Sequence, residues 1–122
     1  MGVVHHAAYL PWLEEARVAM LRDAGHPYTQ VRADGLDLAV IETHVRYLLA
    51  ARFEDAIVIH LRIGAVRGST FQIAYLLLRD VETISTAVTV HACLDRESGR
   101  PRRAPAWLHE LAAGETGTLV GT

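Results

Sequence analysis

Lysine is absent from the 122-residue chain, and all twelve basic side chains are arginine. The net charge of −2 lacks the basic excess typical of nucleic-acid-binding proteins, so we expect no nucleic-acid partner. No apolar run reaches the roughly 20 residues that span a bilayer, so we expect no membrane insertion. Because the chain has no lysine, any anion site must use backbone amides or arginine, whose planar guanidinium suits phosphate.

Cysteine occurs only once, at Cys93, so no disulfide can form within the chain. A lone thiol fits a reducing compartment. The first residues lack the basic and apolar segments of a secretory signal, and we expect a cytoplasmic protein. None of the seven histidines has a zinc-binding spacing such as HExxH, so we expect no metal site.

A helical repeat covers residues 7–24. Gly25 and then Pro27 end it. No Ser, Thr, Asp or Asn caps its start, which leaves backbone amides free there. Its apolar positions recur at steps of three and four, which predicts one buried face. These positions are Tyr9, Leu13, Ala16 and Met20.

Segments of alternating polarity follow a predicted loop at residues 25–35. Alternation with period two predicts strands with one buried face. The predicted strands are residues 36–49, 56–66, 70–79 and 83–94. We expect one α+β domain over residues 1–113, in which a long helix precedes a four-strand antiparallel meander and a short helix at 105–113. Residues 114–122 are rich in Gly and Thr, and this composition predicts a flexible tail.

The opening segment, residues 2–17, resembles the signature of the 4-hydroxybenzoyl-CoA thioesterase family, which includes acyl-CoA thioesterases associated with the Tol-Pal system. Segments at 45–55, 67–71 and 89–105 match the family in the same order. The resemblance implies the hotdog fold, a long helix wrapped by an antiparallel β-sheet. It also implies a homodimer or homotetramer that hydrolyses an acyl-CoA between subunits. The coenzyme A thioester is the substrate, and no cofactor is implied.

The predicted site begins at the start of the helix. A thioester carbonyl needs hydrogen-bond donors where negative charge develops, and free amides at a helix start supply them. By resemblance, the amide near His6 contacts this carbonyl, beside Gly2 and Val3, and Gly2 lets the backbone approach closely. The His6 side chain either orients water, polarises the substrate or fills space. Tyr9 either packs in the core or lines the acyl pocket.

Glu14 has two interpretations. Another branch of hotdog thioesterases uses a helix carboxylate placed similarly, which makes Glu14 a catalytic candidate beside His6. Alternatively, Glu14 forms an ion pair with Arg17, three residues on. His91 and Cys93 share one strand face, but no third orienting group is apparent, so we interpret both as packing.

Coenzyme A phosphates require basic residues or amides. The candidates are Arg52, Arg67 and a cluster of Arg100, Arg102 and Arg103, each of which is equally explained as a solvated charge. Ser69 and Thr70 either bond the pantetheine arm of coenzyme A or stabilise a hairpin turn.

The family motif places a catalytic aspartate three residues before the glycine that matches Gly2, which falls upstream of Met1. The first strand of the fold is missing as well. Either the start is assigned too late, or the chain is truncated and Glu14 substitutes. Positioned base catalysis contributes roughly 10²–10⁴-fold. We therefore expect weak or no hydrolysis from the chain beginning at Met1, and far more from an extended chain carrying that aspartate.

Two other functions stay open. One is a non-catalytic acyl-CoA-binding module that has lost its carboxylate. The other is an acyl dehydratase or hydratase using His6 and Glu14, although the Gly- and Pro-rich segment of those enzymes is absent between them.

Overall fold

The computed structural model describes residues 9–50, 56–114 and 118–121. Three helices and five strands occur within these ranges. In chain order they are α1 (Tyr9–Asp23), α2 (Tyr28–Ala33), β1 (Leu36–Tyr47), β2 (Ile57–Arg67), β3 (Thr70–Arg79), β4 (Glu82–Asp95), α3 (Ala106–Ala113) and β5 (Thr118–Gly121).

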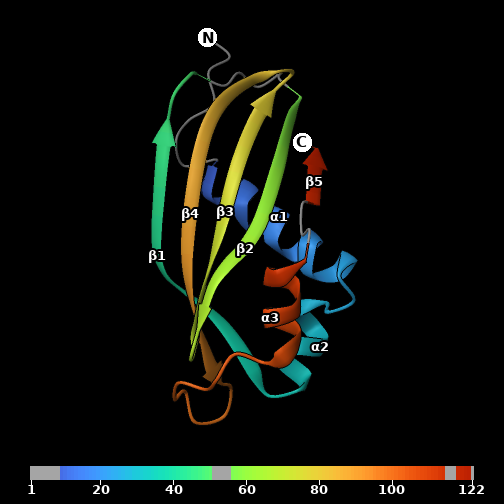
Figure 1. Ribbon diagram of the computed structural model, residues 1–122, viewed down its shortest axis with the longest axis vertical. Coiled ribbons are helices and arrows are strands. Elements are labelled where there is room, and N and C mark those ends of the chain that lie inside the picture. Colours follow the sequence, from blue (N-terminus) through green and yellow to red (C-terminus); the bar gives the residue numbers. More distant parts are fainter. Residues whose placement is uncertain (1–8, 51–55, 115–117, 122) are drawn as a thin grey trace.

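The strands form one antiparallel sheet in the order β1-β4-β3-β2-β5 (Figure 1). Strands β2, β3 and β4 form the predicted meander. The predicted place of β1 beside β2 is wrong, because β1 pairs with β4 along its whole length. The segment between Tyr47 and Ile57 is longer than the roughly two to five residues of a hairpin loop, so the two strands need not be neighbours.

Helix α1 packs its apolar stripe against this sheet, which confirms the predicted α+β architecture. Figure 1 shows the strands curving past α1. The four predicted positions of the helix are all buried, with at most 2% of each residue exposed. They meet the buried side chains of the central strands. The largest of these are Ile57, Ile59, Leu61, Ile63, Phe71, Ile73, Leu77 and Ile84.

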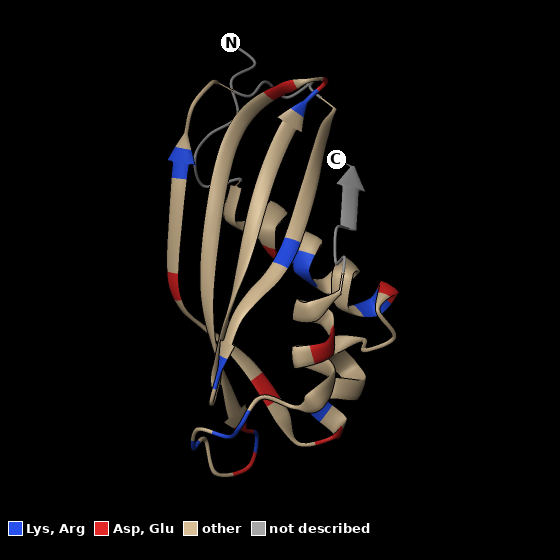
Figure 2. Ribbon diagram, in the orientation of Figure 1, with Lys and Arg blue, Asp and Glu red and all other residues tan. Residues whose placement is uncertain are grey.

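Strand β4 buries its more polar face. Thr89 and His91 are 1% and 2% exposed, while Val88 and Val90 on the other face are only half-buried. Figure 2 shows that the middle of β3 and of β4 carries no charged residue. Buried hydroxyl and imidazole groups cost free energy unless they are hydrogen-bonded, so this face requires internal partners.

Two short elements lie where the sequence predicts irregular structure. Helix α2 occupies part of the predicted loop at 25–35, between Gly25 and Gly35, both with φ of +87°. Six residues are too few for a helical repeat to stand out in a sequence. The sequence also predicts a flexible tail over 114–122, whereas the structure pairs Thr118–Gly121 with β2 as β5. The backbone of β2 would otherwise present an open edge there.

Within the described ranges, every helix is too short or too polar to cross a lipid bilayer.

Helix α1 offers a matched test of the core. Leu13 is 1% exposed and Leu10 is 52% exposed. We predict that Leu13→Ala lowers the free energy of unfolding by about 2–5 kcal/mol, because it leaves a cavity. Leu10→Ala should cost about 1 kcal/mol or less. Urea titrations measure both, and equal losses would contradict the packing of α1.

Candidate active site

A groove runs along α1 on the side that faces β1. It consists of a cavity of about 500 Å³ and a neighbouring one of about 280 Å³. Glu14, Arg17 and Val40 border both cavities, so the two lie side by side, and we call them together the α1 groove. The larger cavity is also lined by Val18, Leu21, Tyr28, Arg32, Leu38, Phe71, Ile73 and His91. The smaller is also lined by Leu10, Pro11, Leu13, Thr43 and Thr89.

The α1 groove is mostly apolar, with a few polar groups. This composition is typical of small-molecule sites, in which an apolar lining holds the ligand and a few polar groups orient it. Glu14 is the carboxylate of the described lining, and it is exposed at the surface of α1.

A chain of hydrogen bonds crosses from α1 into the sheet beneath the groove. Arg17 Nη1 donates to Tyr75 Oη at 3.2 Å. Tyr75 Oη lies 2.7 Å from Thr89 Oγ1, and Thr89 Oγ1 lies 2.8 Å from His91 Nε2. We call these four residues the polar chain. Their hydrogen bonds to one another satisfy the hydroxyl groups of Tyr75 and Thr89, which β3 and β4 bury under the helix.

Arg17, the first member of the polar chain, is the starting point for assigning hydrogen-bond donors and acceptors. A guanidinium only donates, so the Tyr75 oxygen accepts from Arg17. The Tyr75 hydroxyl can then donate to Thr89, which donates to His91 Nε2. Any other arrangement would leave a hydroxyl proton of Tyr75 or Thr89 unpaired in addition to Nδ1 of His91. His91 is therefore the tautomer with its proton on Nδ1, and this buried Nδ1 has no hydrogen-bond partner in the described structure.

Burial shifts the acidity of the groups around the polar chain. Burial and, second, the charge of Arg17 lower the pKa of His91 to about 4. Burial raises the pKa of Tyr75 above its ordinary value, against the opposing effect of Arg17. Burial also raises the pKa of Cys93 to about 11. The thiol stays protonated near neutral pH, which agrees with its interpretation as a packing residue.

The structure locates some of the sequence-predicted site residues. Gly2, Val3, His6 and Arg52 lie outside the described residues. Tyr9 opens α1 and is buried; its ring contacts Tyr47 edge-on, with centroids 4.9 Å apart. Glu14 borders the α1 groove, as stated above. Its alternative partner, Arg17, turns to Tyr75 instead, because the buried phenol lies under that side of the helix.

The residues predicted to hold coenzyme A lie around the β2–β3 turn. Arg67 is exposed, and its carbonyl accepts a hydrogen bond from Thr70 Oγ1 at 3.1 Å. The Ser69 carbonyl accepts from the Cys93 amide at 2.6 Å. In this structure Thr70 therefore performs the turn role that the sequence left open. Arg102 of the tail cluster donates to the Gly35 carbonyl at 3.1 Å.

The two groups of predicted residues lie at opposite ends of the sheet. Tyr9 contacts Tyr47, which pairs with Ser85 of β4, whereas Thr70 pairs with Ala92. The stretch of β4 from Ser85 to Ala92 spans about 23 Å at roughly 3.3 Å per residue. One chain therefore does not bring the start of α1 and the β2–β3 turn together.

A helix laid along a curved antiparallel sheet, with a mostly apolar groove beside it, defines a hotdog-fold protein. The sequence model of the thioesterase-like superfamily matches residues 1–111, and the chain belongs to this family.

Individual relatives agree with this assignment. The chain is 30% identical to the acyl-CoA thioesterase YbgC of Haemophilus influenzae, over 85% of this chain and 77% of the relative. It is 29% identical to the acyl-CoA thioester hydrolase YbgC of Escherichia coli O157:H7, over 85% and 78%. A crystal structure of a hypothetical protein from Thermus thermophilus has a TM-score of 0.83 and 32% identity, over 92% and 86% of the two chains.

Sequence reasoning missed the polar chain. Its members are far apart in the sequence, and the sequence does not show which face of β4 is buried. The available signal was the polar side chains at alternate positions of residues 85–93, on one face of a long strand. Burying a row of polar side chains costs free energy, so such a row requires hydrogen bonds within the protein.

The lowered pKa of His91 predicts acid sensitivity. The unfolded chain binds a proton at His91 near pH 6.5, whereas the native protein does so only near pH 4. His91 therefore stabilises the fold fully above pH 6.5, and this stability is lost as the pH falls towards 4. The loss should total about 3 kcal/mol. Urea unfolding at several pH values measures it.

Two histidine variants make this prediction specific. His91→Gln should flatten the pH dependence between pH 6.5 and pH 4, because it removes the group that titrates. His44→Gln, at an exposed position of β1, should keep the wild-type slope. A His91→Gln profile as steep as that of the wild type would refute the assignment.

Proposed function

We propose that the α1 groove binds the acyl group of a coenzyme A thioester, which this enzyme hydrolyses to a free acid and coenzyme A. The protein is a thioester hydrolase of the acyl-CoA thioesterase type, like the relatives that it matches along most of their length. The observation that carries the substrate assignment is the mostly apolar groove bordered by Glu14. Its larger cavity alone, at about 500 Å³, falls within the volume range of small-molecule sites.

Hydrolysis requires a water molecule to attack the carbonyl carbon while the bond from carbon to sulfur breaks. We assign Glu14 to accept the proton of that water, with the proton ultimately reaching the departing thiolate. Glu14 lies in the first half of α1, so backbone amides at the helix start are close along the chain. These amides, with those near His6, are proposed to stabilise the negative charge that develops on the carbonyl oxygen. Coenzyme A is the leaving half of the substrate, and no cofactor takes part.

A matched pair of variants tests Glu14. Glu14→Gln should lower kcat/KM for acyl-CoAs by roughly 10²-fold or more, because an amide cannot accept the proton. Glu15→Gln, an exposed neighbour outside the groove lining, should leave kcat/KM unchanged. Release of free thiol from a panel of aromatic, short-chain and long-chain acyl-CoAs provides the measurement.

Three outcomes are informative. Full activity in Glu14→Gln would show that another group accepts the proton and would refute the assignment of Glu14. Binding of acyl-CoA without thiol release would favour the non-catalytic module. Hydration of an enoyl-CoA, measured as the loss of its absorbance, would favour the hydratase.

The separation of the predicted residues supports a homodimer. The start of α1 and the β2–β3 turn are about 23 Å apart along β4. Both can serve one substrate if the turn, with Arg67, comes from a second subunit. Strand β1 offers a surface for that subunit, since Val40 and Ile41 are 44% and 53% exposed on a strand that pairs on one side only within the described residues. The pairing of β1 with β4 shifts register between Val40 and Glu42, which is a bulge at Ile41.

The assembly prediction uses two exposed apolar residues. Ile41→Lys should shift the protein from dimer to monomer at micromolar concentration and lower thioesterase activity, because it places a charge in the proposed interface. Val81→Lys, at a 95% exposed position of the β3–β4 turn, should keep the dimer. Light scattering coupled to size exclusion measures both. A wild-type monomer, or a dimer unaffected by Ile41→Lys, would contradict the β1 interface.

We also propose a cytoplasmic location, which rests on the single free and buried thiol of Cys93.

A further inference from the structure

His91 lines the α1 groove and has one ring nitrogen without a hydrogen-bond partner among the described residues. Its ring borders the larger cavity and stacks on Phe71, with centroids 4.9 Å apart and planes 10° apart. Nε2 is occupied by Thr89, and the residue is 98% buried, yet Nδ1 has no partner among the described residues. His91 borders this cavity, and an acceptor bound there is the available partner for the buried donor.

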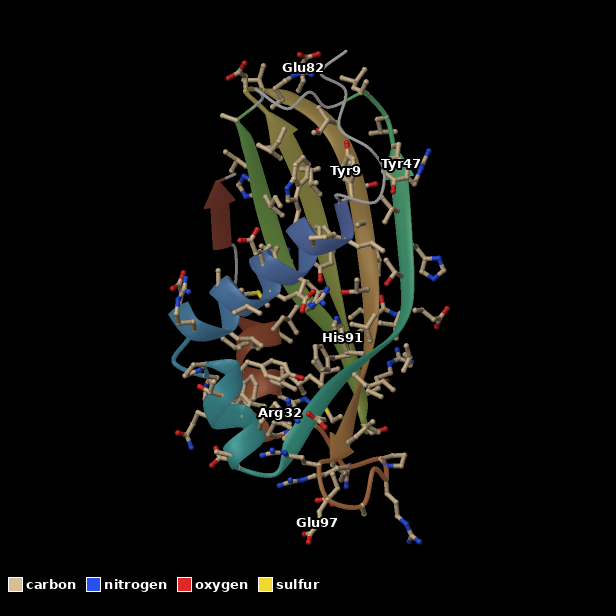
Figure 3. All side chains as sticks on the ribbon, turned by 180° about the vertical axis from the view of Figure 1, so that it is seen from behind. Tyr9, Arg32, Tyr47, Glu82, His91 and Glu97 are labelled. Atoms are coloured by element: carbon tan, nitrogen blue, oxygen red, sulfur yellow. The ribbon has the colours of Figure 1, made fainter. Side chains whose placement is uncertain are left out.

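The polar chain determines what that acceptor must be. The arrangement of hydrogen bonds that leaves the fewest groups unpaired puts the proton on Nδ1, which can then only donate. A flip of the ring would keep the stack on Phe71 but would lose the hydrogen bond between Nε2 and Thr89. Figure 3 shows His91 on the face of the sheet that the helices cover.

His91 also lies at a different position along the groove from the start of α1. The groove follows α1 from Leu10 in the smaller cavity to Leu21 in the larger, about 17 Å at 1.5 Å per residue. His91 lines only the larger cavity, which is the part beyond Glu14 as seen from the helix start. A group that meets His91 is therefore separate from a carbonyl held at the start of α1.

We propose that His91 is a specificity-determining residue whose Nδ1–H donates to an oxygen acceptor in the outer part of the acyl group. The enzyme then prefers acyl chains that carry an ether or keto oxygen beyond the thioester carbonyl over plain hydrocarbon chains of the same length. This inference rests on the proposed function, since it places the acyl group in the α1 groove.

The probes are S-hexyl-coenzyme A and a series of analogues in which an ether oxygen replaces one chain methylene, at each position in turn. These thioethers cannot be hydrolysed, so binding is measured without turnover. An ether oxygen accepts but does not donate, and it nearly preserves the size of the chain. Calorimetry should find one oxygen position that binds about tenfold more tightly than S-hexyl-coenzyme A, because the plain chain leaves Nδ1–H unpaired.

Variants assign the preference to His91. His91→Phe, which keeps the stack on Phe71, should reduce the tenfold ratio to about one. Thr89→Val removes the hydroxyl that fixes the tautomer and should also reduce the ratio, with little change in volume. Ile73→Val, which enlarges the same cavity by a methyl group, should change the affinities for both probes alike and keep the ratio.

Nitrogen-15 spectra of the histidines test the tautomer directly, because a purely structural His91 would not need a defined proton position. At neutral pH His91 should show a protonated Nδ1 and a bare Nε2, and Nδ1 should shift when the preferred ether probe binds. A proton on Nε2, or equal affinity for all probes, would overturn the proposal.

Thiol release from the matching acyl-CoAs separates this inference from the proposed function. Turnover with no preference for the oxygen-bearing chain would refute only the role of His91. A preference in binding without any thiol release would refute hydrolysis and keep the role of His91. Failure of every probe to bind would refute both.

Discussion

The cost of burying polar groups on β4 is the constraint on which the rest of the site depends. The strand turns Thr89 and His91 inward under α1, where water does not reach them. Arg17 crosses from the helix and starts a hydrogen-bond chain that ends at His91. This chain links α1 to the sheet beside the groove. It also leaves one buried ring nitrogen, on a residue that lines the groove, without a partner among the described residues.

The same geometry separates two functions of the molecule in space. Chemistry is assigned to the start of α1 and Glu14, while recognition of the acyl group is assigned to the floor formed by β3 and β4. The β2–β3 turn with Arg67 lies at the far end of the sheet, and a second subunit can bring it to the helix start. The proposed dimer would also cover the apolar side chain of Ile41, which is exposed on β1.

Local patterns in the sequence predicted α1, the four long strands and the pairing of β2, β3 and β4, but not the place of β1. The stripe of α1 and the alternation in β3 were visible because each repeats over several turns or residues. The partner of β1 was not predictable, because sheet order depends on contacts distant in sequence. The hydrogen bond from Arg17 to Tyr75 was not predictable for a related reason: spacing along the helix suggests Glu14 as a partner, whereas Tyr75 is distant in sequence. His6 and Gly2 lie outside the described residues and stay predictions.

A crystal structure with S-hexyl-coenzyme A bound tests the central claim most directly, since the claim concerns where the acyl group lies. The account predicts the sulfur near the start of α1, the chain passing Glu14, and its end in the cavity that His91 lines. An alkyl chain bound outside the α1 groove, on the far face of the sheet or beyond α3, would contradict it.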